Sequence, residues 1–468
     1  MRRGADVTVV DWATQQGARV AGVRETGAPD PEFRVEALRP EVAGAGSARD
    51  PRDELDEREA RDEAKRSEQA RHAHWLHIAR EVADDLAIDA VDREQAGRPP
   101  LDEVARLRES GLLTLLAKTE HGGRGAGWRT AYAVVRTIAA ADAAIGQLLG
   151  CHYFLSFTAR FFATPALAAR VEREAVAGRW FFGGGIASDD TPPTLTTGGA
   201  SSAGHLLTGR QSSVTGAFVA DRLVVRAARS GGGEPLAVLV DPAQAGVVYG
   251  DGEGGGFGQR LAGGGSAEFD AVPVAADAVF GSLSADEGVL SPFAGLAAPA
   301  ARLVSVQLCL GLAEGLLAEV REFSRAAGSA WPPPAAQPWP GGRAQDPYVV
   351  SAYGELTVTA RSASALADQA VRALTRGLAR GEDLDDDECA EIAVLASVAE
   401  AAAARAAEEI TSRALEVVGP RAAPLRHGFD RFWRNARAHT LREPVAHRLR
   451  EVGDYFLNGA HPAFALPA

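Results

Sequence analysis

The chain has 468 residues with a formal net charge of −13, and 46% of its residues are hydrophobic. A chain of this length can form two or three domains and bury a large core. The acidic balance argues against nucleic acid as a partner, because phosphate binding requires a basic surface.

Residues 1–73 differ in composition from the rest of the chain. From Arg49 to Arg71, acidic and basic residues alternate and leave almost no apolar face. Such a segment buries too little surface to offset the entropy lost on ordering. We therefore expect this extension to be disordered, with one solvated helix as the alternative.

Residues 74–179 show the periodicity of a helical domain. Apolar residues recur at spacings of three and four from Trp75 to Leu86. Thr130–Phe162 predicts two strongly apolar helices with a break near Gly146–Gly150. The longest charge-free apolar run, Ala143–Ala159, is shorter than the roughly 20 residues of a membrane span. We expect a buried helix there and no membrane association.

Residues 180–284 have a different pattern, with short β-branched and apolar runs between Gly, Pro, Asp and Ser. The glycine clusters lack a following helix with a phosphate-binding fingerprint, so they indicate turns. The runs predict a β-domain whose clearest strands are Leu206–Gly209, Arg222–Arg226, Leu236–Asp241 and Ser266–Val274.

Residues 285–468 predict a helical bundle. A proline-rich loop, Trp331–Gly342, follows its first helix. The expected helices are Ser291–Ala326, Val349–Arg380, Asp387–Val418 and Phe429–Leu457.

The last expected helix mixes cations with apolar bulk. Arg431, Arg434, Arg437, His439 and Arg442 stand among Phe, Trp and Leu. Burying an unpaired charge is costly. The mixture therefore favours a helix that faces an anionic ligand or a charged subunit interface, and a salt-bridged helix with a core stripe is the alternative.

This same segment, RFWRNARAHTLREP at 431–444, resembles the carboxyl-terminal signature of a known family. The family comprises flavin-dependent monooxygenases on the acyl-CoA dehydrogenase fold, such as dibenzothiophene and sulfone monooxygenases. Stretches at 107–128, 140–153 and 345–356 resemble it in the same order. The resemblance implies an α+β fold, with an amino-terminal helical domain, a middle β-domain and a carboxyl-terminal four-helix bundle. It also implies a homotetramer with each flavin near a subunit contact.

The resemblance also suggests how the flavin is held. Thr215 and Gly216 follow a strand where the family lines the flavin ring, and an ordinary Thr-Gly strand end is the alternative. Arg325 matches a family position at the end of the first bundle helix, and Arg325 or Arg421 is expected to bind the flavin phosphate. The family's second phosphate-binding arginine is replaced by Ser329. The cofactor is expected to be FMN, and FAD stays possible.

On the substrate side, His152 and His439 match the family's pattern and are expected near the reacting centre. A histidine on an apolar helix is also often a satisfied core group. Arg442 stands where the sulfur monooxygenases carry a histidine, and Glu443 where many acyl-CoA dehydrogenases keep a catalytic base. The expected pocket further departs from dibenzothiophene monooxygenase at Gln147, Cys151 and Gly184.

The leading interpretation is a two-component monooxygenase that receives reduced FMN from a separate flavin reductase and oxidises a small apolar molecule. One alternative is an FAD-dependent acyl-CoA dehydrogenase with Glu443 as base. Another is a degenerate, non-catalytic family member. The three cysteines are widely separated, so we expect no metal site and a cytoplasmic location.

Overall fold

The structure, a computed structural model, describes residues 51–186, 191–198, 204–232, 234–250, 256–262, 264–284, 290–326, 342–442 and 444–466. The chain divides into two units, Met1–Asp62 and Glu63–Ala468, and the fold lies in the second. Within it, the predicted order of helices, strands and helices is confirmed.

The amino-terminal part is helical. Its first helix begins at Pro51, so the charged run that we expected to be disordered is helical from that residue, as in the alternative. Residues 1–50 lie outside the described part. The helices are α1 (Pro51–Ala87), α2 (Ala90–Ala96), α3 (Leu101–Glu109), α4 (Trp128–Ala141), α5 (Ala143–Phe162) and α6 (Pro165–Gly178).

The break between the two apolar helices, α4 and α5, lies at Asp142 and not near Gly146–Gly150. The Asp142 side chain accepts hydrogen bonds from the backbone N–H groups of Ala144 and Ile145, at 3.1 and 3.2 Å, and so caps α5. Gly146 lies inside α5, where an added Cβ would lie 2.6 Å from the Ala139 Cβ. This glycine therefore allows α5 to approach α4 closely.

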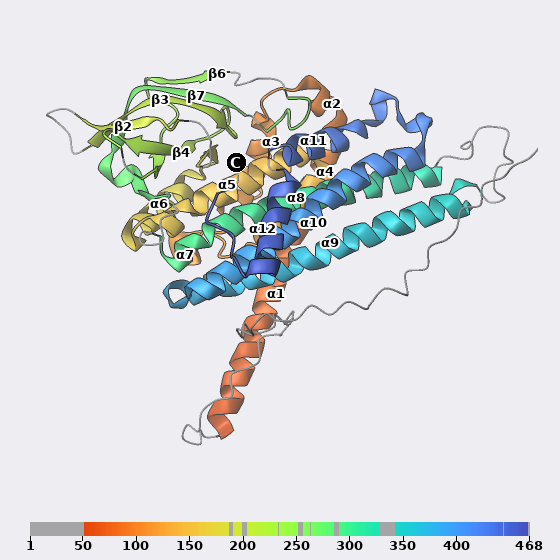
Figure 1. Ribbon diagram of the computed structural model, residues 1–468, viewed down its shortest axis with the longest axis horizontal. Coiled ribbons are helices and arrows are strands. Elements are labelled where there is room, and N and C mark those ends of the chain that lie inside the picture. Colours follow the sequence, from red (N-terminus) through yellow and green to blue (C-terminus); the bar gives the residue numbers. More distant parts are fainter. Residues whose placement is uncertain are drawn as a thin grey trace, which may run out of the picture. The chain divides into compact units, whose positions relative to one another are not determined.

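The middle of the chain forms one mixed sheet with the strand order β6-β7-β3-β2-β4-β5-β8, and β1 pairs with β4 (Figure 1). The four predicted strands correspond to β3, β4, β5 and β7. The others have only four residues each and lack a readable alternation. The strands are β1 (Phe182–Gly185), β2 (Thr194–Thr197), β3 (Gly204–Val214), β4 (Arg222–Arg229), β5 (Leu236–Val240), β6 (Val247–Gly250), β7 (Gly265–Ala275) and β8 (Val279–Ser282).

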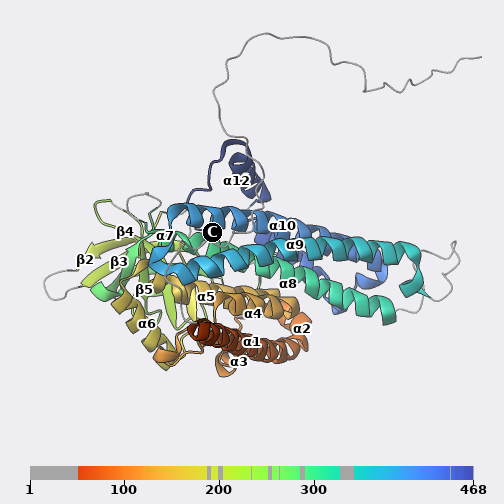
Figure 2. The same ribbon diagram turned by 90° about the horizontal axis from the view of Figure 1, so that it is seen from below.

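The carboxyl-terminal helices pack on one another and on α4 and α5 (Figures 1 and 2). The fourth predicted helix is in fact two, one that ends at Thr440 and one that begins at Val445, because Pro444 cannot continue α11. The helices are α7 (Pro292–Gly295), α8 (Ala297–Ala326), α9 (Pro347–Arg380), α10 (Asp386–Val418), α11 (Asp430–Thr440) and α12 (Val445–Asn458).

The main core joins the amino-terminal helices to α8, α9 and α10, and a second core lies in the sheet. The segment Pro292–Ala326 is long and apolar enough to cross a membrane. Its most apolar window, however, is 72% buried inside the protein, as expected for a core helix.

Candidate functional site

The end of β3 lies beside β1, and glycines make this approach possible. The backbone groups of Gly184 and Thr215 exchange two hydrogen bonds, of 2.9 and 3.0 Å. Gly216 then turns the chain with a φ of +69°, and an added Cβ would lie 3.1 Å from the Phe181 ring. This turn leaves the Thr215 side chain half-buried at the junction of the sheet with α5.

Cys151, on α5, meets Thr215 at this junction. Burial raises the pKa of the Cys151 thiol to about 11, although the charge of Arg442 and the Thr215 side chain both act to lower it. The thiol therefore stays protonated at neutral pH. Cys151 of α5 and Thr215 after β3 are therefore near one another, and Arg442 is near enough for its charge to act on the thiol.

His439 lies in the last turn of α11, close to Arg442. Burial, and then the charge of Arg442, lower the His439 pKa to about 4, so the ring is neutral at pH 7. Its Nδ1 atom is buried and has no hydrogen-bond partner among the described residues. A neutral imidazole with a spare nitrogen can donate to or accept from a bound molecule.

Arg325 and Arg421 lie elsewhere. Arg325 is exposed in the last turn of α8, where its guanidinium pairs with Glu322 at 3.3 Å. Arg421 follows α10 in a short 3-10 helix. The carboxyl ends of α8 and α10 are at the end of the bundle away from the sheet (Figures 1 and 2). One chain therefore does not bring these arginines to Thr215.

His152 is buried on α5, and both its ring nitrogens face backbone groups. The Phe182 N–H donates to Nδ1 at 3.0 Å, so Nε2 carries the hydrogen and donates to the Leu113 carbonyl oxygen at 2.8 Å. The ring stacks on Phe181. With neither nitrogen available to a substrate, His152 fits a positioning role at the start of β1, and its expected catalytic role stays a prediction.

Lowering the pH should weaken the fold through His152. Burial lowers its pKa from 6.5 to about 4. Between these values the unfolded chain binds a proton that the folded chain does not, so the free energy of unfolding falls as the pH falls. The loss should reach about 3 kcal/mol at pH 4. Urea denaturation from pH 7 to 4 should show a shallower pH dependence in His152→Gln, and equal slopes would refute this assignment.

Two residues of the expected site, Glu443 and Ser329, lie outside the described residues, and their roles stay predictions. No group of three metal-ligating side chains occurs within the described ranges. A buried ionic cluster was not predicted from the sequence: Arg302 of α8 bonds to Ser397 of α10 and pairs with Glu451 of α12. The feature of the sequence that could have indicated this cluster is Arg302, a charged residue in an otherwise apolar stretch of α8.

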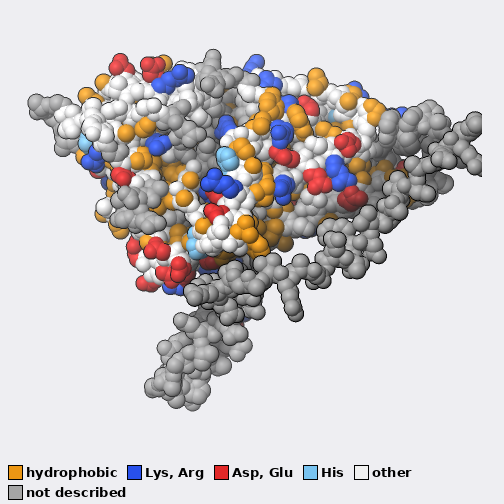
Figure 3. All heavy atoms as spheres, viewed as in Figure 1, with side chains coloured by type: hydrophobic (Ala, Val, Ile, Leu, Met, Phe, Trp, Pro, Cys, Tyr) orange, Lys and Arg blue, Asp and Glu red, His pale blue; other side chains and the backbone are white. Residues whose placement is uncertain are grey.

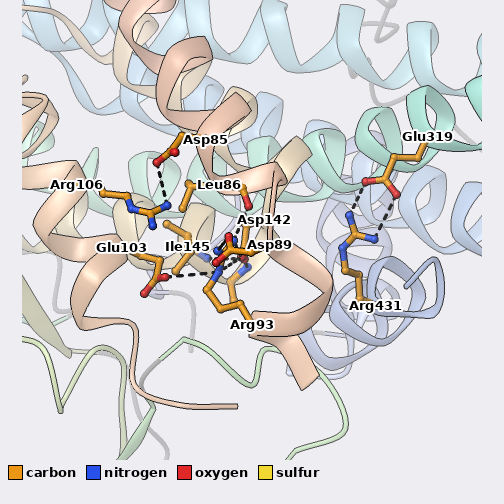
Figure 4. Close-up of polar contacts among 11 residues, drawn as sticks. Asp85, Leu86, Asp89, Arg93, Glu103, Arg106, Asp142, Ile145, Glu319 and Arg431 are labelled. Atoms are coloured by element: carbon orange, nitrogen blue, oxygen red, sulfur yellow. Dashed lines mark hydrogen bonds and ion pairs between the residues drawn. The ribbon is translucent and has the colours of Figure 1, made fainter. Parts of the chain in front are cut away.

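Most cations of the carboxyl-terminal segment form salt bridges. Arg431 binds Glu319 (Figure 4), and Arg434 binds the buried Glu94 at 2.8 Å. On the face drawn in Figure 3, cationic and anionic side chains are likewise interspersed. The salt-bridged alternative therefore describes much of α11, whereas His439 and Arg442 at its end do not follow it.

Residues 69–179 match the acyl-CoA dehydrogenase N-terminal domain, and residues 299–443 match the acyl-CoA dehydrogenase C-terminal domain. A dibenzothiophene monooxygenase of Rhodococcus erythropolis is 33% identical over 82% of this chain and 93% of its own length. The probable FMNH2-dependent monooxygenase SfnC of Pseudomonas putida is also 33% identical, over 83% of this chain and 96% of its own.

Solved structures that are similar to this chain also include monooxygenases. The FMN-bound dibenzothiophene monooxygenase TdsC from Paenibacillus sp. A11-2 has a TM-score of 0.77 and 33% identity, covering 84% of this chain and 100% of TdsC. Methanesulfinate monooxygenase MsuC from Pseudomonas fluorescens has a TM-score of 0.78 and 31% identity, covering 84% and 99%. Butyryl-CoA dehydrogenase from Megasphaera elsdenii, at 18% identity, shares the fold.

Proposed function

Because the chain belongs to the acyl-CoA dehydrogenase family, in the group that contains the dibenzothiophene monooxygenases, we propose that it is an FMN-dependent monooxygenase acting on a small organic molecule. The observation that carries the proposal is the junction at which the turn of Thr215 and Gly216, after β3, pairs with Gly184 and packs against Leu148 of α5. Ligand sites commonly occupy such junctions.

The residues at this junction fit a flavin. Gly216 presents no side chain, and Thr215 offers a hydroxyl that can donate to the ring. Reduced FMN supplies the oxygen chemistry when bound, by activating O2 for transfer of one oxygen atom.

Other residues near the junction would exclude water from the bound flavin and offer it a hydrogen-bonding group. Neutral His439 provides a buried nitrogen that can exchange a hydrogen bond with a bound molecule. Leu148 and Phe181, which contact the position of Gly216, are fully buried and give the junction a dry wall. A dry site strengthens each hydrogen bond within it and protects a reactive flavin from water.

We propose a homotetramer, in which a neighbouring copy would bring Arg325 and Arg421 to the flavin phosphate. Two features support this assembly. Arg325 lies in the last turn of α8 and Arg421 follows α10, and the carboxyl ends of these two helices lie at the end of the bundle away from the sheet (Figure 1). Large apolar side chains are also exposed on α9 and α12, including Tyr348, Val358 and Phe456. Light scattering of the purified protein would give the mass of the assembly, and a monomer would refute it.

We also propose that a separate reductase supplies the reduced FMN and that the protein works in the cytoplasm. The name of the relative SfnC supports use of FMNH2. Adding purified flavin reductase, NADH and FMN should start substrate oxidation, whereas the chain with oxidised FMN alone should be inactive. Turnover without any reductant would contradict the two-component scheme.

The test of the function is an anaerobic titration with reduced FMN, followed by mixing with ¹⁸O2. Bound flavin should reoxidise more slowly than free flavin, and a substrate such as dibenzothiophene should gain one ¹⁸O atom. If the flavin reoxidises as it does free in solution and no tested substrate gains ¹⁸O, the proposed activity is wrong.

Replacing Thr215 by valine should weaken FMN binding about two- to tenfold, because one neutral hydrogen bond contributes about 0.5–1.5 kcal/mol. Valine keeps the volume but removes the hydroxyl. Flavin fluorescence titration measures the change. Ser213→Ala, at an exposed position of the same strand, is the matched control and should bind FMN like the natural chain. Equal affinities of all three proteins would remove Thr215 from the flavin site.

A further inference from the structure

A groove lies between the end of α5, the start of α6 and the short helix α7. It has a volume of about 390 Å³, which is enough for a small organic molecule. The described residues that line it do not include Cys151 or Thr215. Phe161, which does line it, follows Cys151 by ten positions on α5, or about 15 Å along the helix axis. The groove is therefore a separate space from the candidate flavin junction.

One wall of the groove is aromatic. Phe161 and Phe162 end α5, and Phe293 comes from α7. The centroid of the Phe161 ring lies 6.1 Å from that of Phe162 and 5.7 Å from that of Phe293. Aromatic rings attract cations and pack well on apolar groups. This wall therefore suits an apolar body that carries a positive charge.

His121 brings a polar nitrogen to the groove. It ends the 3-10 helix η2 (Thr119–His121), and its side chain is only 10% exposed. Its Nδ1 lies 3.1 Å from the Glu172 carboxylate. Because a carboxylate only accepts hydrogen bonds, Nδ1 carries the hydrogen, and Nε2 of the neutral ring keeps a lone pair. The Nε2 atom lies 3.7 Å from the Glu120 carboxylate, beyond hydrogen-bond distance. His121 thus offers the groove an acceptor.

Glu172 holds this imidazole in place. Its carboxylate also accepts hydrogen bonds from the Arg160 guanidinium, at 2.7 Å, and from the Lys118 backbone N–H. Burial acts to raise the Glu172 pKa, but the charge of Arg160 and these hydrogen bonds bring it below its ordinary value. The ionised carboxylate therefore orients His121, and its own oxygens are already occupied.

Glu382 gives the groove an excess negative charge. It lies in the short turn between α9 and α10, and its exposed carboxylate has no ion-pair partner in the described part of the chain. The other charged side chains of the groove are paired. Arg160 pairs with Glu172. Lys118 pairs with Glu120 at 3.2 Å. An unpaired carboxylate and an imidazole acceptor both favour a positively charged hydrogen-bond donor.

We propose that this groove binds a small organic cation, an ammonium group carried on an aromatic or apolar body. The ammonium would donate a hydrogen bond to His121 Nε2 and be attracted by the charge of Glu382. Its body would pack on Phe161 and Phe293. This second site goes beyond the proposed monooxygenase function and does not depend on FMN.

The test is isothermal titration calorimetry of the full chain with three probes that share a phenyl body. Phenethylamine is the cation, 2-phenylethanol is the neutral probe and phenylacetate is the anion. The amine should bind at least about tenfold more tightly than the alcohol, as expected for a hydrogen bond from a charged group. The anion should bind no more tightly than the alcohol. An amine that binds no better than the alcohol would overturn the inference.

Two variants test the contacts. His121→Phe should weaken amine binding by at least about tenfold, because it removes the acceptor while Glu172 keeps its bond to Arg160. Glu382→Gln should weaken it about two- to fivefold, as expected for an exposed charge. Asp383→Asn is the matched control, because Asp383 is an exposed carboxylate next to Glu382 that does not line the groove. It should bind the amine like the natural chain. Circular dichroism checks that each variant folds, and unchanged amine binding in the folded variants would contradict the site.

Saturating FMN separates this site from the candidate flavin junction. The amine should bind with the same affinity with and without FMN. If FMN abolishes amine binding, the amine occupies the flavin junction and the inference is wrong. If the chain binds no FMN, the proposed monooxygenase function fails, whereas titration of the flavin-free chain still decides whether the groove binds a cation.

Discussion

Replacing Arg93 by methionine should lower the free energy of unfolding by about 3–5 kcal/mol, because it leaves buried carboxylates without a counter-charge. Arg93, on α2, bonds to Asp142 at 2.9 and 3.1 Å and to the Leu86 carbonyl oxygen at 2.7 Å (Figure 4). It also pairs with Asp89 and, at 3.8 Å, with Glu103. Urea denaturation measures the change.

The expected loss of stability comes from the burial of the carboxylates that Arg93 pairs with. Since the exposed fractions of the Asp142 and Glu103 side chains are only 6% and 10%, water cannot replace the lost partner. The double variant Arg93→Met/Asp142→Asn should regain part of the stability, because asparagine removes one charge and can still cap α5.

An exposed arginine that also pairs with two carboxylates is the matched control. Arg413 binds Glu355 and Glu409, and its side chain is 38% exposed. Surface pairs contribute little, so Arg413→Met should leave the free energy of unfolding nearly unchanged. Similar losses in the Arg93 and Arg413 variants would show that burial does not set the contribution of these pairs.

Replacing Gly184 by asparagine should cost more than about 4 kcal/mol or prevent folding altogether. Asparagine is the residue that the resemblance assigns to this position in dibenzothiophene monooxygenase. Here, Gly184 has a φ of +128°, and an added Cβ would lie 2.1 Å from the Val224 carbonyl oxygen. Because that atom belongs to β4, the β1–β4 pairing would have to open. The relatives' asparagine therefore cannot simply be restored.

Gly185, the next residue of β1, provides the control. An added Cβ there would meet the Gln211 side chain at 3.1 Å and the Ser213 carbonyl oxygen at 3.3 Å. A small adjustment relieves such contacts, so Gly185→Ala should cost about 1 kcal/mol. Circular dichroism and thermal unfolding compare the two variants. A Gly184→Asn protein as stable as the natural chain would show that the close approach of β1 to β4 is wrong.

The sequence predicted the long elements well, because their signals are local and repeated. The apolar periodicity of α8 and α10 continues over many turns, and α5 is a nearly unbroken apolar run. The family resemblance rests on four collinear stretches and was confirmed by relatives that cover most of the chain. Short strands such as β1 and β6 were missed, because four residues carry too little pattern.

Single residues of the candidate site could be predicted from the sequence, but which of them lie close together in the fold could not. The family resemblance indicated Thr215, Arg442 and Cys151 as separate positions in the sequence. Only the tertiary structure decided that the turn at Thr215 and Gly216 packs against β1 and α5, and that both nitrogens of His152 are used by the backbone. The physical reason is that helix and strand patterns arise from neighbours in the chain, whereas a site depends on the packing of elements that lie far apart in sequence.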